Sequence, residues 1–145
     1  MKKTIIILIF ISILVIACNT ERKKYEISGN QSNMIKEMID AVNEKNPEKY
    51  VIGFAEDVKV FVESQMKVNG KIDLKNNRAT HFENHPDVRS EIQHLVEIDN
   101  KVILHDKVWL DDSDKEGQDI VEIFTFKDEK IIRVDVIQPK DLFRN

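Results

Sequence analysis

The sequence predicts an α+β domain in which helices near the N-terminus pack against one face of a bent antiparallel sheet. Apolar residues recur at helical spacing between residues 34 and 42. Apolar and polar residues alternate in residues 58–64 and in four longer runs between residues 88 and 137. Helices followed by consecutive strands are typical of the α+β class, and 145 residues suffice for one domain with a single core.

The first 17 residues are interpreted as a secretory signal peptide and not as part of the fold. Lys2 and Lys3 precede an apolar run from Thr4 to Ala17. That run is shorter than the roughly 20 residues that span a bilayer, but its length suits the apolar region of a signal peptide. An uncleaved short anchor is the alternative interpretation.

The stretch "VIAC", Val15 to Cys18, resembles the lipobox of bacterial lipoproteins. The resemblance implies cleavage before Cys18 and acylation, for example with palmitate, of that cysteine. We therefore expect an exported protein, anchored by lipid to a membrane of the bacterial cell envelope; an ordinary signal peptide remains the alternative. Cys18 is the only cysteine, so no disulfide can form within the chain.

The charge balance is acidic, with 26 Asp and Glu against 22 Lys and Arg. The chain has no basic stripe, so we expect no nucleic-acid partner. An acidic domain is not attracted to anionic lipid surfaces, so the lipid on Cys18 is expected to hold the protein at the membrane.

The mature chain is predicted to consist of a polar tether, residues 18–30, and one domain, residues 31–145. Met34 to Val42 form the apolar face of a first helix, with Ser32 as its N-cap. Asn46-Pro47 ends this helix, and Pro47 suits the first position of a second, shorter helix.

Residues 58–64 follow as a strand, and Asn69-Gly70 predicts a hairpin turn. A third helix is predicted from Leu74 to His85. Two long strands, residues 88–98 and 101–110, are joined at Asp99-Asn100.

The last hairpin carries the candidate site. With Asp128-Glu129 as a two-residue turn, Glu122 lies opposite Asp135, and Arg133 lies diagonal to Glu122. Phe124 shares their face. The other face is apolar and consists of Val121, Ile123, Thr125, Ile132, Val134 and Val136.

Two opposed carboxylates destabilise a sheet unless a cation such as Arg133 lies between them. In a pocket, burial and the neighbouring charge would raise the pKa of one carboxyl group. Glu122 and Asp135 are therefore candidate catalytic carboxylates, with Phe124 and Arg133 as pocket residues. A salt-bridged cluster without chemistry is the alternative.

The segments "HPDVRSEIQHLVEIDNKVILHDKVW" and "VEIFTFKDEKIIRVDVIQP" resemble the second half of the nuclear transport factor 2-like superfamily, in particular its SnoaL-like branch of polyketide cyclases and predicted aldol-condensation enzymes. The resemblance implies a cone-shaped fold, frequent dimers, and a pocket on the concave face that includes Glu122 and Asp135. It also places Asp106 on that face. The His-Trp pair usual in the branch's predicted enzymes is Arg133-Val134 here, so the expected proton shuttle is missing.

The positions of the histidines do not indicate a metal site, and we expect no cofactor. His81 and His85 have the spacing of helical metal ligands, but Pro86 forces His85 out of helical geometry. His94 is predicted to lie opposite His105, as a surface or interface pair.

Three functions follow as hypotheses. The first is a membrane-anchored SnoaL-like domain that binds a small, partly apolar ligand in the concave pocket. The second is an isomerase, cyclase or aldol-type enzyme that uses a carboxylate base. The third is a dimeric interaction domain without a ligand. A homodimer is expected through the apolar face of the last hairpin.

Overall fold

The computed structural model describes residues 30–139. The predicted signal peptide, Cys18 and nearly all of the predicted tether lie outside the described residues. Three helices are present, α1 (Asn30–Asn43), α2 (Pro47–Tyr50) and α3 (Lys71–Asn84). The strands are β1 (Phe54–Val62), β2 (Gln65–Asn69), β3 (Arg89–Ile98), β4 (Lys101–Trp109), β5 (Gln118–Lys127) and β6 (Lys130–Ile137).

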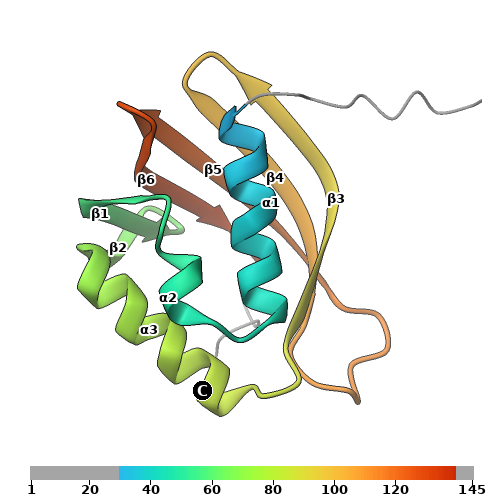
Figure 1. Cartoon of the computed structure of the whole chain (residues 1–145). Coiled ribbons are helices and arrows are strands. Elements are labelled where there is room, and N and C mark those ends of the chain that lie inside the picture. Colours follow the sequence, from blue (N-terminus) through green and yellow to red (C-terminus); the bar gives the residue numbers. More distant parts are fainter. Residues whose placement is uncertain (1–29, 140–145) are drawn as a thin grey trace, which may run out of the picture.

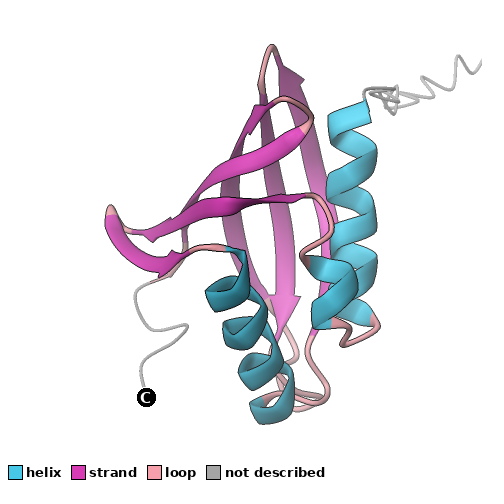
Figure 2. Ribbon diagram, turned by 60° about the vertical axis from the view of Figure 1, so that its left-hand side comes forward, coloured by secondary structure: helices cyan, strands magenta, loops and turns pink. Residues whose placement is uncertain are grey.

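The strands form one six-stranded sheet in the order β2-β1-β6-β5-β4-β3. The sheet bends strongly, and the three helices lie on its concave side (Figures 1 and 2). The predicted α+β class is therefore confirmed. None of the helices in residues 30–139 is long and apolar enough to cross a membrane.

One pair of neighbouring strands departs from the predicted antiparallel sheet. β1 runs parallel to β6, with Val60 paired to Val134 and Phe61 to Asp135. Parallel neighbours need a long crossover connection, and here β2, α3 and the three strands β3 to β5 separate the two strands in the chain.

The first helix begins earlier than predicted. α1 starts at Asn30, so Ser32 is not its N-cap but lies inside the helix, fully buried, with its hydroxyl bonded to Glu97 on β3. The predicted second helix is confirmed. The side chain of Asn46 accepts a hydrogen bond from the backbone N–H of Lys49, and Pro47 follows as the first helical residue.

The predicted turn at Asn69-Gly70 is wrong. The chain reverses earlier, at Glu63 and Ser64, whose φ angles are 48° and 67°. Asn69 instead ends β2, and Gly70 precedes α3 with a φ of 107°. Two non-glycine residues with positive φ have no strong sequence signature, whereas Asn-Gly does.

The helices cover the face of β5 that carries Phe124 and Phe126, as predicted. These side chains are 0% and 3% exposed. Their burial, together with that of the surrounding core, removes apolar area from water and holds the helices to the sheet. The core around them consists of Ile35, Met38, Ile39, Ala41, Tyr50, Val51, Phe54, Val58, Val68, Leu74, Val102, Leu104, Ile131 and Val134.

Candidate functional site

A β-bulge in the last hairpin changes the predicted site. The two-residue turn is present, since Lys127 pairs with Lys130 and Phe126 with Ile131. The next pair is Thr125 with Arg133, so β6 contains one extra residue, Ile132, at this point. An extra residue moves all following side chains of β6 to the other face of the sheet.

The predicted cluster of Glu122, Arg133 and Asp135 is therefore wrong. Glu122 pairs with Val136, and Asp135 pairs with Ile123. Glu122 faces the concave side, while Arg133 and Asp135 lie on the convex side.

Arg133 and Asp135 form a bidentate ion pair with each other on that convex side. Nε and Nη2 of Arg133 donate to Asp135 at 2.7 and 2.6 Å. The guanidinium carbon also lies 4.0 Å from the ring centroid of Phe61. The hydrogen bonds between the two side chains lower the pKa of Asp135 and raise the pKa of Arg133. These two residues stabilise each other and do not reach the concave side.

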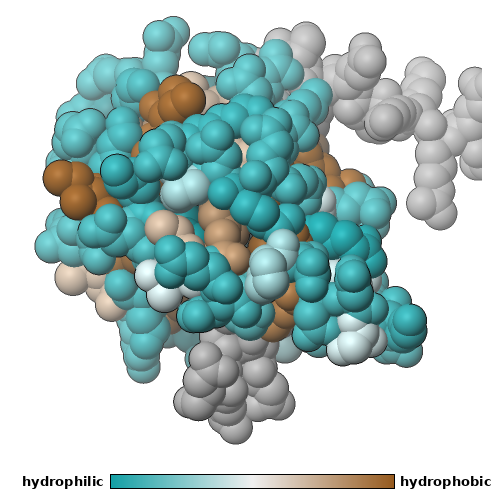
Figure 3. Space-filling model, turned by 60° about the horizontal axis from the view of Figure 1, so that its bottom comes forward, coloured by the Kyte–Doolittle hydropathy of each residue, from teal (hydrophilic) through white to brown (hydrophobic). Residues whose placement is uncertain are grey.

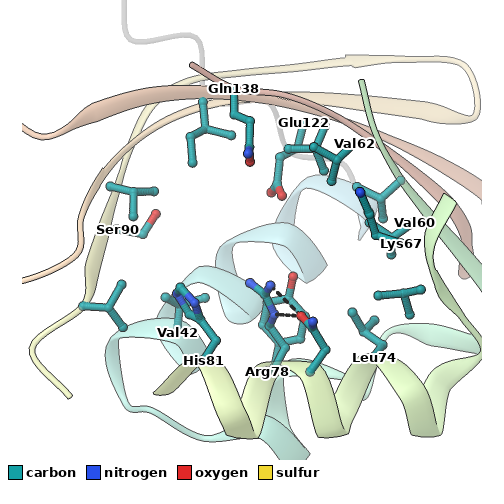
Figure 4. Close-up of a pocket in the computed structure, with 18 of the residues that line it drawn as sticks. Val42, Val60, Val62, Lys67, Leu74, Arg78, His81, Ser90, Glu122 and Gln138 are labelled. Atoms are coloured by element: carbon teal, nitrogen blue, oxygen red, sulfur yellow. Dashed lines mark hydrogen bonds between the residues drawn. The ribbon is translucent and has the colours of Figure 1, made fainter. Parts of the chain in front are cut away.

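A cavity of about 760 Å³ lies between α3 and the concave face of the sheet. Figure 4 shows Glu122 and Gln138 reaching into it from the sheet, with Arg78 and His81 on the opposite wall. On the molecular surface beside α3, small apolar groups of atoms lie between hydrophilic ones (Figure 3). Valines on the sheet and a leucine on α3 provide the apolar lining, namely Val60, Val62, Leu74, Val108, Val134 and Val136.

Glu122 is the acidic group at the centre of this cavity. Burial and, to a lesser extent, the nearby carboxylate of Asp106 raise its pKa from 4.5 to about 8, against the opposing effect of the positive charge of Arg78. At neutral pH the side chain therefore holds a proton and can donate a hydrogen bond.

Asp106 lies on the same concave face, as the family resemblance implied. It is 4% exposed, and its Oδ2 accepts a hydrogen bond from the hydroxyl of Ser90 at 2.6 Å. Within the described residues its Oδ1 has no hydrogen-bond partner. Burial raises the pKa of Asp106, and the bond from Ser90 opposes that shift.

The remaining predicted pocket residue, Phe124, does not line the cavity. It is completely buried in the core, behind the cavity wall. Of the predicted site residues, the structure thus brings together only Glu122 and Asp106.

The wall formed by α3 contains functional candidates that the sequence reasoning missed. Leu74, Arg78 and His81 recur at spacings of four and three, so one face of α3 points them at the cavity, and His85, directly after the helix, also lines it. Burial, together with the positive charge of Arg78, lowers the pKa of His81 to about 3. His81 is therefore neutral at physiological pH. The helical spacing is visible in the sequence, but it indicates only a shared helix face and not the cavity that this face lines.

Histidines on the convex side form a separate polar group. His94 and His105 lie 3.1 Å apart between their Nδ1 atoms, and His105 Nε2 lies 2.8 Å from Asp119. The predicted pairing of the two histidines is confirmed, and it places them away from the cavity. No cluster of three metal-ligating side chains occurs in the part of the chain described here.

The arrangement in the cavity combines an apolar enclosure with a few converging polar groups. Such sites bind small molecules, and carboxyl groups with raised pKa values are typical of acid–base chemistry. The geometry of the described residues therefore allows ligand binding and proton transfer by Glu122.

Solved structures share this fold at low sequence identity. A cystatin-fold protein from Novosphingobium aromaticivorans has a TM-score of 0.67 and 23% identity, over 74% of this chain and 97% of that one. A candidate ketosteroid isomerase from Kribbella flavida has a TM-score of 0.63 and 16% identity, over 79% and 82%. A candidate polyketide cyclase from Sinorhizobium meliloti has a TM-score of 0.60 and 17% identity, over 72% and 93%.

A search of the curated proteins finds no match. A family model for the SnoaL-like domain matches residues 35–134, which include most of α1, the helices α2 and α3, the strands β1 to β5 and the first part of β6. The chain therefore belongs to the SnoaL-like domain family.

Proposed function

We propose that this protein binds a small, partly apolar ligand in the cavity between α3 and the sheet. The observation that carries the proposal is the cavity itself, about 760 Å³ in volume, with Glu122 at its centre. A cavity that served only packing would be filled by side chains, because protein interiors are close-packed. The valines would contact the apolar part of the ligand, and Glu122 would bond its polar part.

Native mass spectrometry of the purified mature chain tests this proposal. We expect a non-covalent adduct that is released on unfolding. Val136→Phe would fill part of the cavity and remove the adduct, and Ile72→Phe, on the exposed side of α3, is the matched control. An unchanged adduct in Val136→Phe, or no adduct on the wild type, would contradict the proposal.

Acid–base catalysis by Glu122 is the second candidate function. The specific observation in its favour is the pKa of about 8, which lies close to the operating pH where a general acid or base is most effective. The carboxylate would remove a proton next to a carbonyl group, and Arg78 on the opposite wall would stabilise the enolate. Asp135 has no part in this proposal because it lies on the convex side.

The isomerisation of a β,γ-unsaturated cyclic ketone, followed through the absorbance of the conjugated product, tests for this activity. We expect the wild type to exceed the buffer rate and Glu122→Gln to lose that excess. Equal rates for the two proteins would exclude Glu122 as the base.

We further propose that the mature protein is anchored to the membrane through lipid on Cys18. The support is the "VIAC" stretch after a short apolar run. Cys18→Ser should abolish labelling by a palmitate analogue and leave the signal peptide uncleaved. A Cys18→Ser protein that is still labelled, or still processed normally, would contradict the anchor.

A further inference from the structure

Among the described residues, the cavity places a cation without an ion-pair partner opposite a protonated acid. Arg78 projects from α3 toward Glu122 across the cavity (Figure 4). Within residues 30–139, no ion pair joins Arg78 to a carboxylate. A buried or half-buried cation is costly without a counter-ion, so this guanidinium is a strong candidate for binding an anion.

The guanidinium of Arg78 is held in place by its neighbours on the helix wall. Nε and Nη2 donate to the side-chain oxygen of Asn77 at 3.3 and 2.8 Å. The guanidinium carbon lies 5.7 Å from the ring centroid of Tyr50. With the Nε side bonded to Asn77, the distal Nη1–Nη2 edge remains for a ligand, and this edge matches the two oxygens of a carboxylate.

None of the acidic side chains that the described residues place on the cavity wall forms an ion pair with Arg78. Glu122 holds its proton, and His81 is neutral. Asp73 accepts a hydrogen bond from the backbone N–H of Asn69 at 2.9 Å. Asp106 is bonded to Ser90 on the sheet. Within residues 30–139, the ionisable side chains on the cavity wall are Tyr50, Glu63, Lys67, Asp73, Arg78, His81, His85, Asp106 and Glu122.

We infer that the ligand of this cavity is an organic carboxylate with an apolar body, its carboxylate bound by Arg78 and by the protonated carboxyl group of Glu122. The apolar body lies against Val60, Val62, Val134 and Val136. This inference rests on the proposed ligand-binding function, and it adds the chemical class of the ligand.

Three probes with the same eight-carbon body test the inference on the mature chain. Titration calorimetry at pH 7 with octanoate, octan-1-ol and octylamine should show that octanoate binds at least about tenfold more tightly than the other two. Arg78→Met should remove this preference and leave octan-1-ol unaffected. Lys75→Met is the matched control, because it removes a charge from α3 outside the cavity lining.

The pH dependence gives a second, independent readout. Above pH 8 Glu122 becomes charged and repels the carboxylate, so octanoate should bind more weakly at pH 9 than at pH 7. Glu122→Gln keeps a donor and never becomes charged, so its affinity should stay level over that range.

The outcomes separate the two levels of the proposal. Preferential binding of octan-1-ol or octylamine overturns the carboxylate assignment and leaves the ligand-binding function standing. An octanoate preference that survives in Arg78→Met also overturns the assignment. If none of the three probes binds, both the carboxylate assignment and the ligand-binding proposal are wrong.

Discussion

Ser32 on α1 donates two hydrogen bonds to one carboxylate oxygen of Glu97 on β3, from its backbone N–H at 3.1 Å and from its hydroxyl at 2.5 Å. Ser32 lies in the first turn of α1, where backbone N–H groups have no partner inside the helix and where a negative charge is favourable. Glu97 therefore connects the first helix to an edge strand of the sheet.

Glu97→Ala should lower the free energy of unfolding by about 1–3 kcal/mol, because it leaves a buried hydroxyl and a buried N–H without an acceptor. Urea unfolding followed by circular dichroism measures the change. Glu91→Ala on the same strand removes an exposed carboxylate and should change the free energy by less than about 0.5 kcal/mol. Equal effects of the two substitutions would show that the Ser32–Glu97 contact contributes nothing.

Glu122 should make the protein less stable as the pH rises. Its pKa is raised from 4.5 to about 8 in the folded protein, so folding favours the protonated form. The associated stability is fully present below pH 4.5 and is lost as the pH rises through 8. Each unit of pKa shift corresponds to about 1.4 kcal/mol, and the partial solvent exposure of Glu122 reduces the effect.

The measurement is the free energy of unfolding of wild type and Glu122→Gln between pH 5 and 9. We expect Glu122→Gln to become more stable than wild type by at least about 1 kcal/mol at pH 8.5 and to lack the decline between these pH values. Parallel pH profiles of the two proteins would mean that Glu122 is already ionised at neutral pH.

Residue patterns predicted the helices α1 and α2, the strands β3 to β6 and the covered face of β5, because these features depend on local periodicity and on where large apolar residues lie. The bulge at Ile132 was not predictable in the same way. The hairpin has a two-residue turn and regular alternation on both strands, so no local pattern marks the extra residue. In the structure the bulge places Val134 and Val136 on the concave side. The positions predicted for Glu122 and Asp106 on the concave side are correct, because these residues precede the bulge. The positions predicted for Arg133 and Asp135 are wrong, because these residues follow it.

Arg133→Met should barely change the unfolding midpoint. In the predicted cluster this substitution would have left two buried carboxylates unpaired. In the structure Arg133 and Asp135 are 48% and 35% exposed, so water replaces the lost partner. Thermal unfolding of Arg133→Met, measured beside the wild type, checks this prediction. A large drop in the midpoint would contradict it and would mean that another surface covers the ion pair.

The sequence predicts a homodimer through the apolar face of the last hairpin. The residues of that face do not all lie on one side of the sheet, so the proposed interface changes. Val134 and Val136 face the concave side, and the convex side instead presents a row across three strands, Val96, Ile103 and Ile123. Val96 is 44% exposed. We predict that two copies pack through this row, because an uncovered apolar row of this kind typically marks an interface.

Ile123→Lys should convert the dimer to a monomer at micromolar concentration, measured by light scattering. Ile72→Lys is the control, since Ile72 is 71% exposed on α3 and lies away from the convex side. A wild-type protein that is itself monomeric at this concentration would contradict the prediction.

The position of β6 determines the order in which the chain can fold. Within the sheet, the β1–β2 hairpin is joined to the other strands only through β6, which is the last strand to leave the ribosome. Phe61 and Asp135 must therefore pair although most of the domain's sequence lies between them. Pairing of residues that are far apart in the sequence slows folding. Until Ile137 has been synthesised, the hairpin lacks the complete β6 edge that it joins, so the sheet closes only when the last of its six described strands is present.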